Sequence, residues 1–158
     1  AAQRTGGEIR MALDKWDARF MQLCQLVASW SKDPSTGCGA VIVDSRQRIV
    51  STAFNGFPRR VDDDPDRLHD RRLKLALTLH AEANSVIFAE RPIRGCTLYV
   101  HPMPPCSQCA ALIIQAGISR VVAPAPAPDL ADRWGESIDL AIMAMREAGV
   151  KVDILENT

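Results

Sequence analysis

Alternating runs of apolar and polar residues divide most of this chain into helices and strands. In residues 15–30, large apolar side chains recur at steps of three and four, which is the spacing of an amphipathic helix. The run 31–34 ends in proline and therefore ends that helix, because proline disfavours helical geometry in the residue before it. Two short apolar runs follow, separated by a polar turn at 45–48. They predict a hairpin with strands at 40–44 and 49–54.

The remainder of the chain alternates between helix and strand. Residues 55–66 are rich in Asn, Gly, Pro and Asp and predict a loop, and a charged stretch follows at 67–74. The later pattern predicts three helices, at 80–90, 107–116 and 138–148, and three strands, at 96–100, 120–123 and 150–155. A short stiff connector is predicted where prolines alternate with alanines, at Pro124, Pro126 and Pro128.

This order of elements predicts the fold class. An opening hairpin followed by strands that alternate with helices favours an α/β fold, a three-layer α/β/α domain on a five-stranded mixed sheet. A length of 158 residues suits one domain with a sizeable core. We therefore expect a loose N-terminal tail at 1–10 and a single domain at 11–158.

The charge balance and the cysteine content of the chain limit the kinds of partner and cellular compartment that we expect. Nineteen basic residues balance 19 acidic ones. A long nucleic acid is therefore not an expected partner, whereas a small anionic ligand needs only one or two donors. No apolar run approaches the roughly 20 residues that span a bilayer, and the first ten residues lack the apolar core of a signal peptide, so no membrane partner is expected. Five cysteines, an odd number, favour a reduced, cytoplasmic protein over a disulfide framework.

Two short motifs carry the candidate chemistry. His80-Ala-Glu82 begins one predicted helix, and Pro105-Cys106-Ser-Gln-Cys109 begins the next. Cysteines three apart on a helix point to the same side, and a helix N-terminus favours thiolates. If the two helices lie side by side on the sheet, their first turns meet. His80, Cys106 and Cys109 then form a three-ligand site for Zn²⁺ with one open position, which is typical of a catalytic zinc.

Glu82 is the candidate catalytic residue of this site. An open zinc position binds water and lowers its pKa, and Glu82 is close enough to His80 to receive that water's proton. A His-x-Glu element followed by Pro-Cys-x-x-Cys is the signature of zinc-dependent nucleobase deaminases, in which the Glu is not a ligand. The alternatives for the two cysteines are a redox pair or half of a structural zinc site. The sequence has no second Cys-x-x-Cys pair to complete a structural site.

For most of the other cysteines and histidines we expect a structural or surface role and no part in the chemistry. We expect packing roles for Cys24, Cys38 and Cys96, and His69 reads as a surface residue in a charged loop. Trp30, at the end of the first helical stripe, is predicted to lie in the core. His101 closes the strand that leads to the Pro-Cys motif, so it should lie near the pocket rim. There it would either touch substrate or remain a solvated loop histidine.

The motifs, with three further segments, resemble the deoxycytidylate (dCMP) deaminases over about residues 16–123. These segments are Ser31-Lys32-Asp33-Pro34-Ser-Thr36 with Gly39-Ala-Val-Ile-Val, Asn55-Gly-Phe-Pro-Arg59 with Asp62-Asp63, and Cys109-Ala-Ala-Leu-Ile-Ile-Gln-Ala-Gly-Ile118. The resemblance implies the cytidine deaminase-like fold and hydrolysis of dCMP to dUMP and ammonia, which feeds thymidylate synthesis. It also implies a homo-oligomer, with a hexamer as one candidate, and dCTP and dTTP as candidate effectors.

Substrate contacts are placed by the same resemblance. Asn55 can offer its amide to the sugar or the base edge. Lys32 and Arg59 are candidate phosphate donors, and the alternative for both is a solvated charge on a loop. Ala81 and Pro105 would line the base.

One departure leaves the exact base open. The segment between Tyr99 and Cys106 has an extra residue and lacks the aromatic residue that often precedes Pro-Cys in that family. The alternatives are a deaminase for a modified deoxycytidylate, a nucleoside, a free purine base or an adenine in RNA. A non-catalytic zinc-binding relative is the other alternative.

Overall fold

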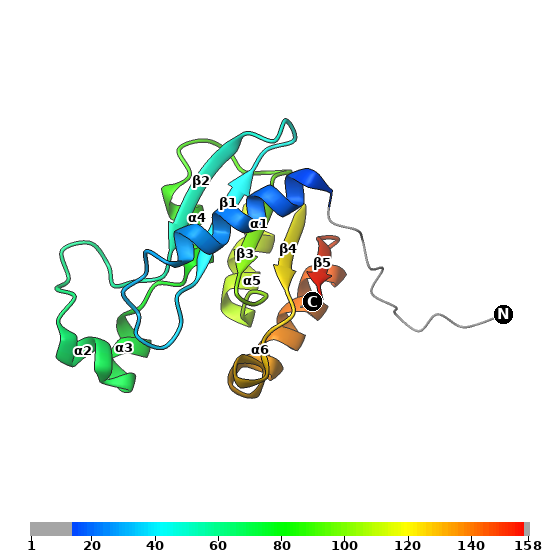
Figure 1. Ribbon diagram of the computed structural model, residues 1–158. Coiled ribbons are helices and arrows are strands. Elements are labelled where there is room, and N and C mark those ends of the chain that lie inside the picture. Colours follow the sequence, from blue (N-terminus) through cyan, green and yellow to red (C-terminus); the bar gives the residue numbers. More distant parts are fainter. Residues whose placement is uncertain (1–13, 157–158) are drawn as a thin grey trace.

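Five strands form one mixed sheet in the order β2-β1-β3-β4-β5 in the computed structural model, which describes residues 14–156 (Figure 1). The strand β1 (Gly39–Val43) pairs antiparallel with both β2 (Ile49–Phe54) and β3 (Thr97–His101). The parallel strands β4 (Arg120–Pro124) and β5 (Lys151–Leu155) extend the sheet from β3. The predicted α/β fold with a five-stranded mixed sheet is therefore confirmed. The tail predicted at 1–10 lies outside the described residues.

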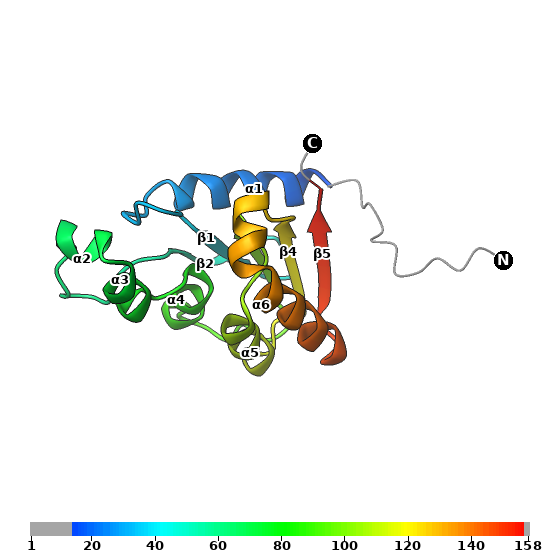
Figure 2. The ribbon, with the colours of Figure 1, turned by 90° about the horizontal axis from the view of Figure 1, so that it is seen from below.

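Helices cover both faces of this sheet. The helix α1 (Lys15–Ala28) packs on β1, β2 and β3 from one side. The opposite side carries α4 (Ala81–Phe88), α5 (Ser107–Ala116) and α6 (Pro128–Glu147), with α5 packed between the other two (Figure 2). Each face encloses its own apolar core, and the larger core lies on the side of α4, α5 and α6. Among residues 14–156, no helix is long and apolar enough to cross a membrane.

A polar network crosses the smaller core between α1 and the sheet. The Asp17 carboxylate on α1 accepts a hydrogen bond from the Tyr99 hydroxyl at 2.5 Å and two from the Arg120 guanidinium at 2.9 Å. Arg120 also donates to Asp153 on β5 at 2.8 Å. Burial alone would raise the pKa of Asp17, but the hydrogen bonds from Arg120 and Tyr99 hold it below its usual value. The network therefore ties α1 to β3, β4 and β5 through a stabilised carboxylate.

We expect Asp17→Asn to lower the free energy of unfolding by about 2–3 kcal/mol at pH 7, because Arg120 and Tyr99 lose a charged acceptor. A carboxyl group whose folded-state pKa is lowered stabilises the protein above its ordinary pKa, and this contribution disappears as the pH falls through the folded-state pKa. The difference between wild type and variant should therefore be constant above about pH 5 and shrink below about pH 4. Urea unfolding across this range measures it.

The control for this experiment is Asp139→Asn, at an exposed position on α6. Its unfolding curves should match wild type at every pH. An Asp17→Asn variant with wild-type stability at pH 7 would contradict the structural role assigned to the network.

The segment between α1 and β1 lies directly against the backbone of α1. A Cβ atom at Gly39 would be 2.3 Å from the carbonyl oxygen of Cys24, and one at Gly37 would be 2.6 Å from that of Ala28. Such distances are far below van der Waals contact, so only glycine allows this close approach. The two glycines thereby fix the position of the loop that carries Ser35, Thr36 and Cys38.

Three sequence predictions need correction. The last helix begins at Pro128, ten residues before the predicted start at 138, because proline is well accommodated in the first turn of a helix. The charged stretch after residue 64 forms two short helices, α2 (Pro65–His69) and α3 (Arg71–Leu77), each capped by an aspartate side chain. Trp30 is 54% exposed and packs edge-on against Phe54, because α1 ends two residues earlier. The predictions of buried positions for Cys24 and Cys96 are confirmed.

Candidate active site

The N-termini of α4 and α5 lie together and bring the two sequence motifs into one site. His80 is the N-cap residue of α4, and Cys106 is the N-cap residue of α5, with Cys109 one turn further on. The Nδ1 atom of His80 is 3.4 Å from the Sγ atoms of both Cys106 and Cys109. Packing of α4 against α5 on the same face of the sheet produces this convergence.

The donor set of this cluster fits zinc. One ligand atom from each of His80, Cys106 and Cys109 lies within 4.8 Å of the others. A tetrahedral Zn²⁺ ion, with bonds of about 2.0 Å to nitrogen and about 2.3 Å to sulfur, separates a nitrogen ligand from a sulfur ligand by about 3.5 Å. The observed distances of 3.4 Å match this edge length. Three protein ligands also leave a fourth position for a reactant, as in catalytic zinc sites.

The electrostatics of the cluster favour metal binding. A hydrogen bond from Cys109, followed by one from His80, lowers the pKa of Cys106 to about 4. Cys106 also occupies a helix N-terminus, where free backbone N–H groups and the helix dipole favour negative charge. The hydrogen bond to Cys106 in turn raises the pKa of His80. The same contact between the two thiols, together with burial, raises the pKa of Cys109. Cys106 is thus the thiolate of the pair, and thiolate is the form that binds metal.

Glu82 faces the same cavity from the first turn of α4. Its side chain is buried, with the residue only 6% exposed, and it lines the cavity beside His80 and Cys106. Burial raises the pKa of the Glu82 carboxyl above its ordinary value, and the positive charge of His80 offsets part of that shift. A buried carboxyl group whose pKa is raised holds a proton more readily than an exposed one, which suits general acid–base chemistry.

The cavity is assembled from six parts of the chain. Its walls come from the loop after α1, the residue after β2, the helix α3, the start of α4, the end of β3 with the segment that joins it to α5, and the first half of α6. Besides the zinc motifs, the lining includes Asp33, Ser35, Thr36, Cys38, Asn55, Arg71, Lys74, Leu75, Thr78, Val100, Met103, Arg133 and Trp134. Cys38, which we expected only to pack, therefore borders the cavity.

Asn55 holds one wall of the cavity in place. Its side-chain amide donates to the Thr36 carbonyl at 3.0 Å and accepts from the Cys38 N–H at 2.8 Å. The Ser31 hydroxyl donates to the Asn55 carbonyl at 3.0 Å. Asn55 thus fixes the loop after α1 while its own side chain lines the cavity.

The other predicted substrate contacts lie outside the lining. Lys32 is exposed and pairs with Asp63 at 2.7 Å, and Arg59 lies over the Phe88 ring at 5.3 Å. Ala81 and Pro105 are buried beside the zinc motifs, and His101 is half-buried at the end of β3, where burial lowers its pKa. None of these five residues is among the residues that line the cavity within 14–156. Their substrate contacts remain predictions.

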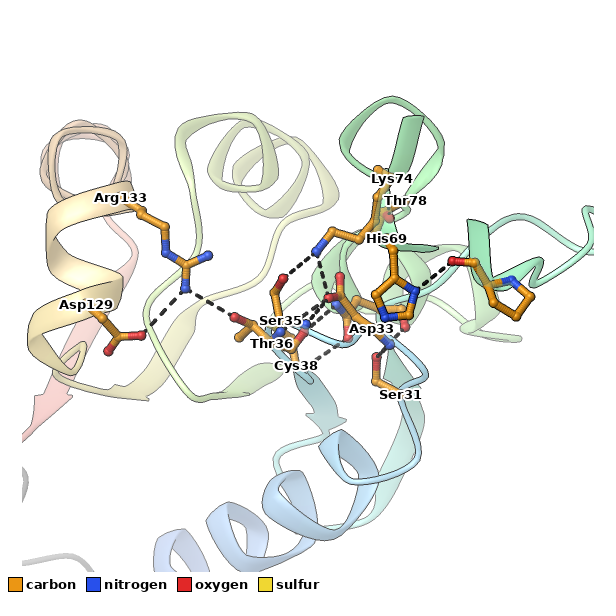
Figure 3. Close-up of polar contacts among 12 residues, drawn as sticks. Ser31, Asp33, Ser35, Thr36, Cys38, His69, Lys74, Thr78, Asp129 and Arg133 are labelled. Atoms are coloured by element: carbon orange, nitrogen blue, oxygen red, sulfur yellow. Dashed lines mark hydrogen bonds and ion pairs between the residues drawn. The ribbon is translucent and has the colours of Figure 1, made fainter. Parts of the chain in front are cut away.

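The sequence analysis gave no site role to most of the residues that line the cavity, and Lys74, Arg133 and Trp134 are three of these. Lys74 ends the stretch that we described only as charged. Arg133 and Trp134 lie between the predicted connector, which ends at Pro128, and the predicted helix at 138–148, where the sequence analysis assigned no element. Figure 3 shows Lys74 and Arg133 reaching the loop after α1 from opposite sides. The Trp134 ring packs edge-on against the His80 ring, with centroids 5.9 Å apart. A helix predicted from Pro128 onward would have shown that residues of its first turns could reach the site.

Comparison with known proteins places this site in a family. A sequence model of the cytidine and deoxycytidylate deaminase zinc-binding region matches residues 14–125. The chain belongs to the cytidine and deoxycytidylate deaminase family. This result confirms the resemblance that the motifs predicted, and it identifies the matched region as a zinc-binding one.

Individual relatives agree with this family. An uncharacterized deaminase from the luxG 3′ region of Aliivibrio fischeri is 48% identical over 140 residues, 89% of this chain and 93% of that protein. Human deoxycytidylate deaminase is 39% identical over 114 residues, and the match covers 68% of this chain but only 64% of the human protein. The fold resembles the dCMP deaminase of cyanophage S-TIM5 in complex with dCMP and dUMP, with a TM-score of 0.69 and 23% identity over 87% of this chain and 95% of that one.

Proposed function

We propose that this protein is a zinc-dependent hydrolytic deaminase that converts dCMP to dUMP and ammonia. The observation that carries the proposal is the convergence of His80, Cys106 and Cys109 around one point, with the buried Glu82 in the same cavity. Membership of the cytidine and deoxycytidylate deaminase family supports it, as does the 39% identity to human deoxycytidylate deaminase.

The three ligands are assigned to hold the metal. When bound in such a site, zinc supplies a water whose pKa is lowered toward neutrality, so that hydrolysis can proceed at neutral pH. His80 at the N-terminus of α4, and Cys106 and Cys109 in the first turn of α5, would hold it. Trp134 packs on His80 and limits the orientations that the His80 ring can adopt.

Glu82 is assigned the proton transfers. It accepts one proton from the attacking water and donates it to the ring nitrogen N3. It then accepts the second proton from the new hydroxyl group on C4 and supplies it to the amino group that leaves. In the overall reaction, a C–O bond forms and the C–N bond at C4 breaks, with one water consumed for each ammonia released. The raised pKa of Glu82 suits a group that must both accept and release a proton.

Several broader properties follow from the family resemblance. The protein is proposed to work in the cytoplasm as a homo-oligomer, to feed thymidylate synthesis, and to respond to dCTP or dTTP. Exposed apolar side chains on α4, α5 and α6 are compatible with burial by another subunit, and they include Ile87, Leu112, Leu140 and Met143.

A substrate panel tests the proposed reaction. Zinc-loaded protein is incubated with dCMP, CMP, deoxycytidine, cytosine, guanine and dAMP, while ammonia release and the ultraviolet spectrum are followed. We expect dCMP to be the best substrate, by at least about tenfold in kcat/KM over deoxycytidine. Turnover of a different amine in preference to dCMP would overturn the substrate. No turnover of any compound at one zinc per chain would overturn the deaminase assignment.

A further inference from the structure

Three cationic side chains line the active-site cavity: Arg71, Lys74 and Arg133. Lys74 is already neutralised, because its Nζ donates to Asp33 at 3.0 Å and to the Ser35 hydroxyl at 2.7 Å (Figure 3). Its side chain is buried, as is most of that of Asp33, so the pair is screened little by solvent. Lys74 therefore holds the loop after α1 in place and contributes no net charge to the cavity.

Arg133 is held far more loosely. Its Nη2 lies 3.4 Å from the Thr36 hydroxyl and 3.7 Å from the Asp129 carboxylate, both longer than a good charge-assisted hydrogen bond. The Asp129 side chain is 75% exposed, and an ion pair with so exposed a partner contributes little. A guanidinium has five N–H donors in a planar fork. Arg133 thus retains donors that a better anion could use.

The position of Arg133 suits a group at the mouth of the cavity. The cavity has a volume of about 70 Å³. A small planar group fits this space, but a whole nucleotide does not, because pockets that enclose drug-sized ligands measure about 300–1,000 Å³. If the reacting base lies beside Glu82, the sugar and phosphate extend toward the mouth. Arg133, partly exposed on α6, is located there together with the Thr36 hydroxyl.

We propose that Arg133 binds the 5′-phosphate of the substrate and makes this enzyme select a mononucleotide over the corresponding nucleoside. This inference rests on the proposed function. Arg133 would exchange its long contact with Asp129 for two parallel N–H···O bonds to the phosphate, the geometry that a guanidinium favours. The Thr36 hydroxyl, 3.4 Å from Arg133, adds a donor from the opposite wall. This assignment replaces Lys32 and Arg59, which lie outside the cavity lining, as the phosphate contact.

The test compares Arg133→Gln with wild type on two substrates, dCMP and deoxycytidine. We expect the KM for dCMP to rise at least about tenfold, as expected for the loss of a charge-assisted bidentate contact, with kcat changed less than about threefold. The kcat/KM for deoxycytidine should stay at the wild-type value. Arg133→Lys should recover part of the preference, because it keeps the charge but not the fork. Arg46→Gln and Arg48→Gln, which remove exposed charges from the turn between β1 and β2, are the matched controls and should behave as wild type.

A binding measurement separates this inference from the proposed reaction. Inorganic phosphate is titrated into zinc-loaded protein, and the fluorescence of Trp134, the neighbour of Arg133, reports its binding without turnover. Phosphate should bind wild type and Arg46→Gln equally, and Arg133→Gln at least about tenfold more weakly. Equal phosphate binding by Arg133→Gln, or an equal loss of activity on dCMP and deoxycytidine, would overturn the inference. Failure of wild type to deaminate dCMP, with Arg133-dependent phosphate binding intact, would instead overturn the proposed reaction.

Discussion

Glu82→Gln should lose at least about 10³-fold in kcat on dCMP while it still binds one zinc per chain. The amide has nearly the same shape as the carboxyl and fits the same buried position, but it cannot accept the proton of the attacking water. Both protons of the attacking water are assigned to pass through this one side chain, so the loss of one group should affect every step. Because Glu82 is not among the three ligands that converge on the metal position, zinc content should not change.

The measurements are single-turnover and steady-state rates together with zinc content by atomic absorption. Glu82→Asp, which keeps the charge but shortens the reach, should retain some activity and lie between wild type and Glu82→Gln. Glu90→Gln provides the matched control, because Glu90 is an exposed carboxylate just beyond the end of α4. Wild-type rates in Glu82→Gln would show that the proton transfers have been assigned to the wrong residue.

Removal of zinc should abolish turnover and lower stability together. A metal that binds only the folded state stabilises it by about 4 kcal/mol when its free concentration is 1,000 times the dissociation constant. A chelator should therefore lower the melting temperature and eliminate activity, and added zinc should restore both. Trp134 packs on the ligand His80, so its fluorescence should report metal loss directly.

Cys109→Ser provides the corresponding variant, since a hydroxyl group is a poor replacement for a thiolate ligand. We expect its zinc affinity to fall at least about 100-fold and its turnover to be lost. Cys38→Ser is the matched control: Cys38 borders the same cavity but is not part of the His80, Cys106 and Cys109 group. It should keep one zinc per chain. If Cys109→Ser bound zinc as tightly as wild type, the ligand set would be wrong.

The sequence predicts the sheet and the convergence of the zinc motifs because both depend on short-range patterns. The strands follow from apolar runs between turn residues, and each zinc motif spans only a few residues at a helix start. His80 and Cys106 lie at such starts, so the side-by-side packing of α4 and α5 is enough to bring them together.

The missed residues depend on long-range packing or on an ambiguous local signal. Alternating proline and alanine before Asp129 is typical of an extended connector, yet Pro128 begins α6, and this error concealed Arg133 and Trp134. Among the many charges of residues 59–74, only tertiary contacts reveal that Lys74 is the one that becomes buried, against Asp33. Local sequence does not encode which cation meets which carboxylate.

The close approach of Gly37 and Gly39 to α1 has a consequence for motion. A loop with two backbone contacts this tight cannot slide or lift away from α1 without opening a gap, so the wall that carries Thr36 and Cys38 behaves as a fixed surface. Lys74 also ties α3 to this loop, so any widening of the cavity during substrate entry and product release must come from the first half of α6. Opening and closing of the cavity would then be a movement of α6 relative to the loop after α1, which stays in place.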